Sequence, residues 1–297
     1  MRRVLRPEHP LDLSCTLRTI RRGVSDPTMR LAGGEVLRAT RTPEGPATVH
    51  FRRDGDRIEV EAWGEGGEWV LQRVPRLLGF DDLPERFRPR HAILRELHLR
   101  HPGLRFGATG AVAEAAVASV LEQKVTGREA WRAYRQLVQR YSEPAPGPHK
   151  LMLPPDPGVL AGLGYYDFHP FGVEKRRADT LLRVCKMAAK LNSLASHPAD
   201  EAGAVLMRIP GIGPWTAAEV SRVALGDIDA VSIGDVHLPH LVSWNLAGEP
   251  RGDDGRMLEL LEPYRGQRAR AVRLLELSGN WAPRRGPRYN PIPIARL

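Results

Sequence analysis

The feature that most constrains this chain is a glycine-rich turn between two helical patterns, IPGIGPWTA at residues 209–217. Pro210, Gly211 and Gly213 end the pattern before them and Trp215 begins the next, so two helices should meet through a tight turn. Glycine tolerates positive φ and lets the backbone lie close to a phosphate, while the N–H groups that open the second helix point toward the anion. The pattern predicts a helix-hairpin-helix that binds one nucleic-acid strand without reading its bases.

An aspartate follows this turn at a defined distance. Asp235 lies twenty positions after Trp215 (235 − 215), behind a short connector, DIDAVSIG, and before an apolar helical pattern, VHLPHLVSWNLAG. The commonest role of an aspartate in front of a helix is to cap it. Spacing from the hairpin is the reason to consider a chemical role as well.

The hairpin followed at this spacing by an aspartate in a V-x-x-G-D-V-H context resembles the helix-hairpin-helix DNA glycosylase superfamily. The tryptophan after Gly-Ile-Gly-x, Trp215, is most similar to the bacterial alkylation-repair branch, 3-methyladenine DNA glycosylase II of the AlkA type. The resemblance runs from about residue 100 to 277 and more weakly into the N-terminal region. It implies a monofunctional enzyme that excises alkylated purines from damaged double-stranded DNA in base excision repair, without a cofactor. A monomer in the bacterial cytoplasm, associated with the nucleoid, is the expected form.

The resemblance makes Asp235 the expected catalytic residue. Cutting an N-glycosidic bond builds positive charge on the deoxyribose, and a nearby carboxylate stabilises that charge while orienting or deprotonating the attacking water. An alkylated base is already cationic, so it leaves without a strong general acid. The alternative is a non-catalytic or damage-recognising DNA-binding protein in which Asp235 only caps the helix.

A second segment is expected to fill the gap left when the base is flipped out of the stack. In the superfamily a Gln-x-Val-Ser-like motif enters the duplex, and LEQKVT at residues 121–126 resembles it. Gln123 and Thr126 match the motif, whereas Lys124 stands where the best-known alkylation enzymes have leucine. All three are expected to contact DNA; whether Gln123 or Lys124 fills the gap stays open, and Gln123 as a plain helix end is the alternative.

The expected base pocket is aromatic. Tyr165, Tyr166 and Phe168 lie in one segment, GYYDFHPFG; Trp215 of the hairpin and His237, two residues after Asp235, are the other candidates. Aromatic faces hold a flipped cationic base by stacking and cation–π attraction. Packing between helices is the alternative for each of these rings.

Strand cleavage is not expected from this chain. Bifunctional relatives form a Schiff base through a lysine directly before the Thr-Ala of the hairpin, and Trp215 occupies that position. Indole has no nucleophilic amine, and no lysine follows Lys190. The resemblance therefore implies a glycosylase without lyase activity.

Charge favours a polyanionic partner. Lys plus Arg number 44 against 35 Asp plus Glu, a net charge of +9 with a pI near 10, as expected for a protein that binds DNA. An arginine-rich composition alone is the alternative explanation. Arg268 and Arg270 on the last helical pattern form either a phosphate-contacting ridge or a solvated face.

Metal and membrane signals are weak. Cys15 and Cys185 lie far apart, which suits free thiols rather than an iron–sulfur site. We expect no metal site in the residue pattern, although the resemblance allows a monovalent cation on backbone carbonyls of residues 208–213. No apolar run approaches a membrane span.

The predicted fold class is α+β. We expect an N-terminal domain with an antiparallel sheet and helices over residues 1–100, an all-α catalytic module over 101–281 and a basic, proline-rich tail over 282–297. Alternation predicts strands at 11–17, 35–40, 47–53 and 57–63, the last two joined as a hairpin, and a helix at 68–78 interrupted near Pro75. Helices are expected at 109–123, 127–141, 157–163, 173–192, 199–208, 215–225, 237–247, 254–263 and 266–278, with a linker at 143–156.

Overall fold

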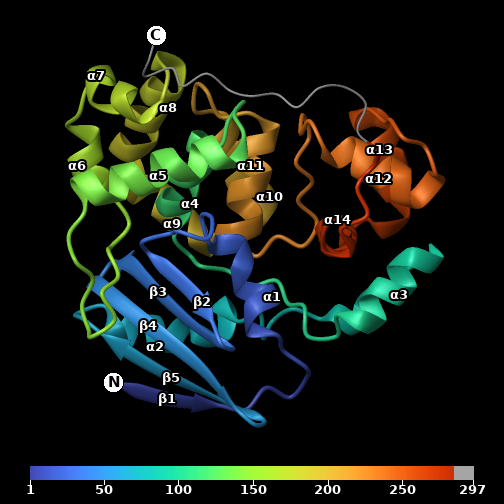
Figure 1. The fold of residues 1–297 in the computed structure, drawn as a ribbon, viewed down its shortest axis with the longest axis horizontal. Coiled ribbons are helices and arrows are strands. Elements are labelled where there is room, and N and C mark those ends of the chain that lie inside the picture. Colours follow the sequence, from blue (N-terminus) through green and yellow to red (C-terminus); the bar gives the residue numbers. More distant parts are fainter. Residues whose placement is uncertain (284–297) are drawn as a thin grey trace.

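The computed structural model describes residues 1–283, so the predicted tail beyond residue 283 lies outside the described part of the chain. A five-stranded antiparallel sheet forms one side of the molecule and helices form the rest (Figure 1). The predicted α+β class is confirmed. Among the described residues, no helix is both long enough and apolar enough to cross a membrane.

The sheet has the strand order β1-β5-β4-β3-β2. Its strands are β1 (Arg2–Leu5), β2 (Met29–Ala32), β3 (Glu35–Thr42), β4 (Gly45–Asp54) and β5 (Arg57–Trp63). The predicted hairpin is confirmed: β4 pairs with β5 up to Asp54 and Arg57, and Gly55 between them has a φ of +58°. Alternate residues of both strands, among them Val49, Phe51 and Val60, are buried because they face one core.

One predicted strand is wrong. The apolar residues of 11–17 alternate, yet the structure places a short helix there, α1 (Leu13–Leu17). The Oδ1 atom of Asp12 accepts a hydrogen bond from the Cys15 N–H at 2.8 Å, which caps this helix. Leu13 and Leu17, four residues apart, are then both buried.

Helix α2 (Gly67–Leu77) continues through Pro75 without the predicted interruption. Proline has no N–H to donate to the carbonyl four residues earlier. The guanidinium of Arg3 donates to that carbonyl, the oxygen of Leu71, at 2.7 Å. A strand residue therefore satisfies the acceptor that the proline leaves open.

Twelve further helices of the described residues follow along the chain. They are α3 (Ala92–Arg100), α4 (Val112–Leu121), α5 (Gly127–Tyr141), α6 (Pro157–Ala161), α7 (Tyr165–Phe168), α8 (Lys175–Lys186), α9 (Ala188–Ser193), α10 (Ala199–Met207), α11 (Pro214–Val220), α12 (Leu238–Ala247), α13 (Asp254–Leu261) and α14 (Arg268–Ser278). The pattern at 173–192, predicted as one helix, is broken at Met187 into α8 and α9. A π-helical turn, Ser221–Leu225, continues α11.

Three main cores hold these elements. Buried helix α4 packs against α8, α9 and α11 in the largest core, and α1 and α2 cover the sheet. Helix α3 belongs to the third core, with α12, α13 and α14, although it falls within the first hundred residues. The domain boundaries stay a prediction.

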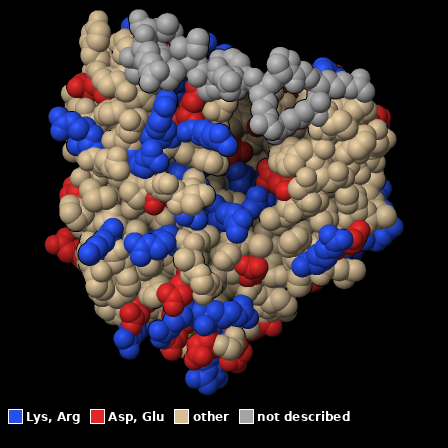
Figure 2. Space-filling view, viewed as in Figure 1, with Lys and Arg blue, Asp and Glu red and all other residues tan. Residues whose placement is uncertain are grey.

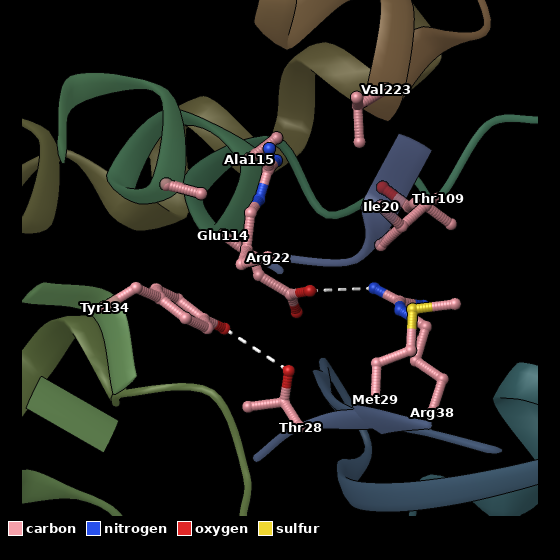
Figure 3. Close-up of a pocket in the computed structure, with 11 residues that line it drawn as sticks. Ile20, Arg22, Thr28, Met29, Arg38, Thr109, Glu114, Ala115, Tyr134 and Val223 are labelled. Atoms are coloured by element: carbon pink, nitrogen blue, oxygen red, sulfur yellow. Dashed lines mark hydrogen bonds and ion pairs between the residues drawn. The ribbon is translucent and has the colours of Figure 1, made fainter. Parts of the chain in front are cut away.

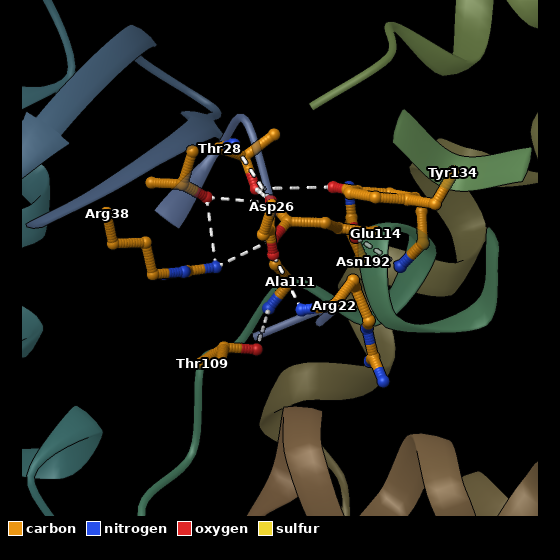
Figure 4. Close-up of polar contacts among 11 residues, drawn as sticks. Arg22, Asp26, Thr28, Arg38, Thr109, Ala111, Glu114, Tyr134 and Asn192 are labelled. Carbon is orange, nitrogen blue, oxygen red and sulfur yellow. Dashed lines mark hydrogen bonds and ion pairs between the residues drawn. The ribbon is translucent and has the colours of Figure 1, made fainter. Parts of the chain in front are cut away.

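A buried polar network joins the sheet to the helices (Figures 3 and 4). Arg38 of β3 lies 2.9 Å from the carboxylate of Glu114 in α4, which also accepts a hydrogen bond from Thr40 at 2.9 Å. Thr28 and Tyr134 of α5 have their hydroxyl oxygens 3.4 Å apart, and burial raises the pKa of Tyr134 above its ordinary value, so the phenol keeps its proton. A cavity of about 10 Å³ beside them has room for about one water molecule. These bonds set the position of α4 relative to the sheet.

Candidate active site and nucleic-acid interface

The tight turn between α10 and α11 has the predicted shape, with two glycines in different conformations. Gly211 has a φ of +97°, and a Cβ there would lie 2.1 Å from Oγ1 of Thr180. Gly213 has a φ of −106° and ends the turn as the residue before α11, with open space where a Cβ would stand. Gly211 is therefore required by packing, whereas Gly213 leaves its side of the backbone accessible.

Asp235 is half-buried at the start of α12, and its carboxylate accepts hydrogen bonds from two backbone N–H groups and one indole N–H group. Its Oδ1 accepts hydrogen bonds from the N–H groups of His237 at 2.7 Å and Leu238 at 3.0 Å. Its Oδ2 accepts one from Nε1 of Trp215 at 2.9 Å. Three N–H donors and the positive end of α12 complement the negative charge of this carboxylate. The capping role is present, and the side chain of Trp215 adds a contact that a cap does not need.

Helix α11 also anchors the loop that carries Asp235. Glu219 lies one turn after Trp215 and accepts a hydrogen bond from the Ser232 hydroxyl at 2.6 Å. Asp254 of α13 accepts from the N–H of Gly234, at 3.1 and 3.0 Å from its two oxygens. The spacing of Trp215 and Glu219 is visible in the sequence, but their partners in the loop are not.

Gln123 ties the turn between α4 and α5 to the hairpin. Its amide nitrogen donates to the carbonyl of Gly211 at 2.9 Å and to Oγ1 of Thr216 at 2.8 Å. Both amide hydrogens of Gln123 are thus used within the protein, and its contact with DNA stays a prediction. Lys124, the next residue, is exposed and has a φ of +55°.

Thr126 has a structural role as well. It caps α5 in a reciprocal capping box with Glu129, whose carboxylate accepts from the Thr126 N–H at 2.9 Å. Of the three residues expected to contact DNA in this turn, Lys124 alone has an exposed side chain without a hydrogen bond within the described residues.

The tyrosine-rich segment lies away from Asp235. It forms α7 rather than a loop, beside α6 and α8 at the left of Figure 1, whereas α12 lies at the right. Phe168 is fully buried in the largest core, and Tyr166 is 85% exposed to solvent. Tyr165 packs its ring edge against His169. Phe168 is therefore a core residue and its assignment to the base pocket is wrong, whereas the roles of Tyr165 and Tyr166 in the pocket stay predictions.

Trp215 and His237 both contact the carboxylate of Asp235. The backbone of His237 is hydrogen-bonded to the carboxylate, and its side chain is exposed at the start of α12. Trp215 is half-buried. Whether these two side chains hold a base stays a prediction.

The two arginines of α14 both make ion pairs within the protein, and for Arg268 a contact with DNA stays a prediction. Arg270 is 1% exposed and is paired with Asp82, and its Nη1 donates to the carbonyl of Leu104 at 3.2 Å. Its assignment as a DNA contact is wrong. Arg268 makes a two-point ion pair with Asp229, which fixes α14 to the loop that carries Asp235.

The surface around this region is basic. Figure 2 shows a face hollowed near its centre, with Lys and Arg side chains in and around the hollow. Within residues 1–283 no three His, Cys, Asp or Glu side chains lie together in a way that would hold a metal ion. The carbonyls of Pro210 and Gly211 already accept from Arg183 and Gln123, and a cation on the remaining hairpin carbonyls stays a prediction.

The two cysteines are free. Burial raises the pKa of the Cys185 thiol to about 12, which keeps it protonated and unreactive near neutral pH.

Comparison with known proteins places this geometry in a known fold. No family model matches the chain. A curated relative, a probable bifunctional transcriptional activator and DNA repair enzyme AlkA from Mycobacterium tuberculosis, is 31% identical over 147 residues, which cover 49% of this chain and 29% of the relative. The chain thus matches less than a third of that relative's length.

Solved structures match over almost the whole chain. A 3-methyladenine DNA glycosylase from Archaeoglobus fulgidus has a TM-score of 0.79 at 20% identity and covers 94% of this chain and 98% of its own. An 8-oxoguanine glycosylase/lyase from Clostridium acetobutylicum, in complex with double-stranded DNA, has a TM-score of 0.68 at 12% identity and covers 92% of each chain. The chain therefore shares the fold of these two DNA glycosylases, which is the fold that the resemblance in its sequence implied.

Proposed function

We propose that this chain is a monofunctional DNA glycosylase that excises alkylated purines from duplex DNA. The observation that carries the proposal is the carboxylate of Asp235, half-buried at the start of α12 and held by the indole N–H of Trp215. The negative charge of Asp235 is held in place by a direct hydrogen bond from α11, the second helix of the hairpin. A carboxylate placed in this way beside a bound DNA strand has the chemistry that cleavage of an N-glycosidic bond needs.

In this mechanism the hairpin binds the strand and the damaged nucleotide is flipped out of the stack. The bond between C1′ and the base nitrogen breaks, and its electron pair leaves with the base. Asp235 stabilises the positive charge that develops on the sugar and orients the water whose oxygen bonds to C1′. The proton lost by that water passes to the carboxylate or to solvent, and the product is an abasic site.

Alkylated purines are the proposed substrates because they are cationic. Their positive charge makes the base a good leaving group, so a single carboxylate suffices and a second acid is not required. The face of Trp215 beside Asp235 would also attract a cationic ring. The names of the Archaeoglobus and Mycobacterium relatives, a 3-methyladenine DNA glycosylase and a DNA repair enzyme AlkA, support this class of substrate.

Absence of lyase activity is the second part of the proposal. The Clostridium relative is named a glycosylase/lyase, so this fold is found with both activities. In this chain the position directly before the Thr-Ala of the hairpin is Trp215, and the sequence has no lysine after Lys190. Without an amine at that position, hydrolysis by water is the remaining route.

A second candidate is a non-catalytic protein that binds damaged DNA. It is favoured by one observation, that both oxygens of Asp235 are already hydrogen-bonded within the protein, two of the three bonds being those of a helix cap. In that case Asp235 would hold α12 in place and do no chemistry.

Release of free base from methylated duplex DNA separates the two candidates. The proposal predicts release of 3-methyladenine or 7-methylguanine, detected by chromatography, with strands that break only after alkali or heat and no covalent adduct after borohydride. Binding without release would favour the non-catalytic candidate. Release together with a trapped adduct would overturn the monofunctional part alone.

A further inference from the structure

A basic groove lies between α8 and the hairpin turn. It has a volume of about 460 Å³ and is formed by α8 and the hairpin turn. Its lining residues are Lys175, Arg176, Asp179, Thr180, Arg183, Pro210 and Gly211. The proposed reaction uses the hairpin but none of the α8 residues that line this groove.

The groove carries more positive than negative charge. Lys175 pairs with Asp179 at 2.8 Å, the single acidic residue of the lining. Arg176 is exposed and has no ion pair within the described part of the chain, and Arg183 donates to the carbonyl of Pro210 at 3.2 Å. A guanidinium that is bound to a neutral carbonyl keeps its full charge, so two arginines remain to attract an anion.

The groove is continuous with the hairpin. Thr180 of α8 packs against Gly211 so closely that a Cβ at that glycine would clash, and Arg183 donates to the carbonyl of the preceding residue of the turn, Pro210. An anion in the groove would therefore lie directly beside a strand bound by the hairpin.

The spacing of the arginines suits an extended polyanion. Arg176 and Arg183 are seven residues apart on α8, which places them on the same face about 10.5 Å apart along the helix axis. One DNA strand carries a phosphate about every 3.4 Å along the duplex axis. Both side chains can thus face one strand at different phosphates, which a compact anion does not allow.

We propose that Arg176 and Arg183 of α8 form a second phosphate-binding surface, which holds the sugar-phosphate backbone of the duplex flank beyond the hairpin. The proposal rests on the proposed function, because it assumes that the hairpin binds DNA. It adds an element to the interface that contributes affinity and orientation without reading sequence.

The test measures binding of the full chain to an undamaged duplex by fluorescence anisotropy over a series of salt concentrations. Arg176→Ala is the variant of choice, since the residue is exposed in a helix and alanine favours helix. Arg57→Ala is the matched control, because it removes the same charge from an exposed position at the start of β5, in the sheet on the opposite side of the molecule from α8 (Figure 1).

Arg176→Ala should reduce the slope of log affinity against log salt by about one unit, as for one lost phosphate contact. Arg57→Ala should leave the slope unchanged. When the duplex is shortened stepwise from each end in turn, shortening from one end should bring the wild-type slope down to that of Arg176→Ala. An unchanged slope in Arg176→Ala, or an equal loss in Arg57→Ala, overturns the proposal.

The salt slope of Arg176→Ala and base release by the wild type test the surface and the proposed function separately. A reduced slope in Arg176→Ala together with no base release by the wild type would retain the surface and reject the glycosylase. Base release by the wild type together with an unchanged slope in Arg176→Ala would reject the surface alone.

Discussion

The indole Nε1 of Trp215 lies 2.9 Å from Oδ2 of Asp235 and joins the first turn of the hairpin's second helix to the start of α12. A strand bound at the hairpin and a carboxylate that acts on its sugar must keep a fixed separation. This bond, together with the one from Ser232 to Glu219, fixes that separation, because both bonds tie α11 to the loop that carries Asp235.

Replacing Trp215 with phenylalanine should slow base release while the protein stays folded. A hydrogen bond to a charged group contributes about 1.5 to 3 kcal/mol, so a loss of roughly tenfold to a hundredfold in the rate is expected. Single-turnover release from methylated DNA measures this. Trp244→Phe is the control, because its indole donates to neutral Asn280 at 3.2 Å and its loss should leave the rate near that of the wild type. A Trp215→Phe variant with the wild-type rate would remove Trp215 from the account.

The two hairpin glycines should respond differently to substitution. Gly211→Ala should lower the melting temperature, because the residue has positive φ and its Cβ would lie 2.1 Å from Thr180. Gly213→Glu should fold, since the site is open, but should weaken binding to all DNA sequences alike by placing a carboxylate against a phosphate. Melting curves and anisotropy on damaged and undamaged duplexes check both. Loss of affinity for damaged DNA only would contradict a non-specific role for the hairpin.

Lys124 is the exposed residue at the tip of the turn that Gln123 holds against the hairpin. If its ammonium contacts a phosphate, its removal should reduce the salt slope of binding by about one unit. Lys124→Asn is the suitable variant, because asparagine tolerates the φ of +55° at this position better than alanine. Gln123→Ala should keep the slope but impair base release, since it frees the turn from Gly211 and Thr216. An unchanged slope in Lys124→Asn would show that Lys124 does not reach the backbone.

Arg270 should be needed for stability and not for DNA binding. Breaking its buried pair with Asp82 leaves an uncompensated charge, at an expected cost of about 3 to 5 kcal/mol in the free energy of unfolding. Arg270→Ala should therefore melt at a much lower temperature. Arg265→Ala, which breaks an exposed pair with Glu262, should melt close to the wild type, because exposed ion pairs contribute little to stability. If Arg270→Ala melts like the wild type and binds DNA with a smaller salt slope, the sequence-based assignment would be right after all.

Elements with local signals were predictable from the sequence. The capping box of Thr126 and Glu129 sets the start of α5, so its bounds agree with the prediction, and the turn at Gly55 sets the β4–β5 hairpin. The strand predicted at 11–17 failed through another local signal, the cap formed by Asp12, which outweighed an alternating pattern.

Side chains with distant partners were not predictable. Arg270 resembles a surface arginine until Asp82, 188 residues away in the sequence, is brought beside it. Gln123 likewise finds its acceptor 88 residues away, at Gly211. Periodicity and residue type cannot show such pairs, because they arise from the packing of whole elements.

The most direct test of the central claim compares base release by Asp235→Asn and Asp253→Asn. Both residues cap a helix, Asp253 by accepting from the Arg256 N–H at 2.8 Å, and asparagine is as good a cap as aspartate. Asp235→Asn should lose at least about a hundredfold in release of 3-methyladenine from methylated duplex DNA while binding that DNA nearly as well as the wild type. Asp253→Asn should keep both the wild-type rate of base release and the wild-type affinity for DNA. Undiminished release by Asp235→Asn would contradict the assignment of Asp235 as the catalytic residue.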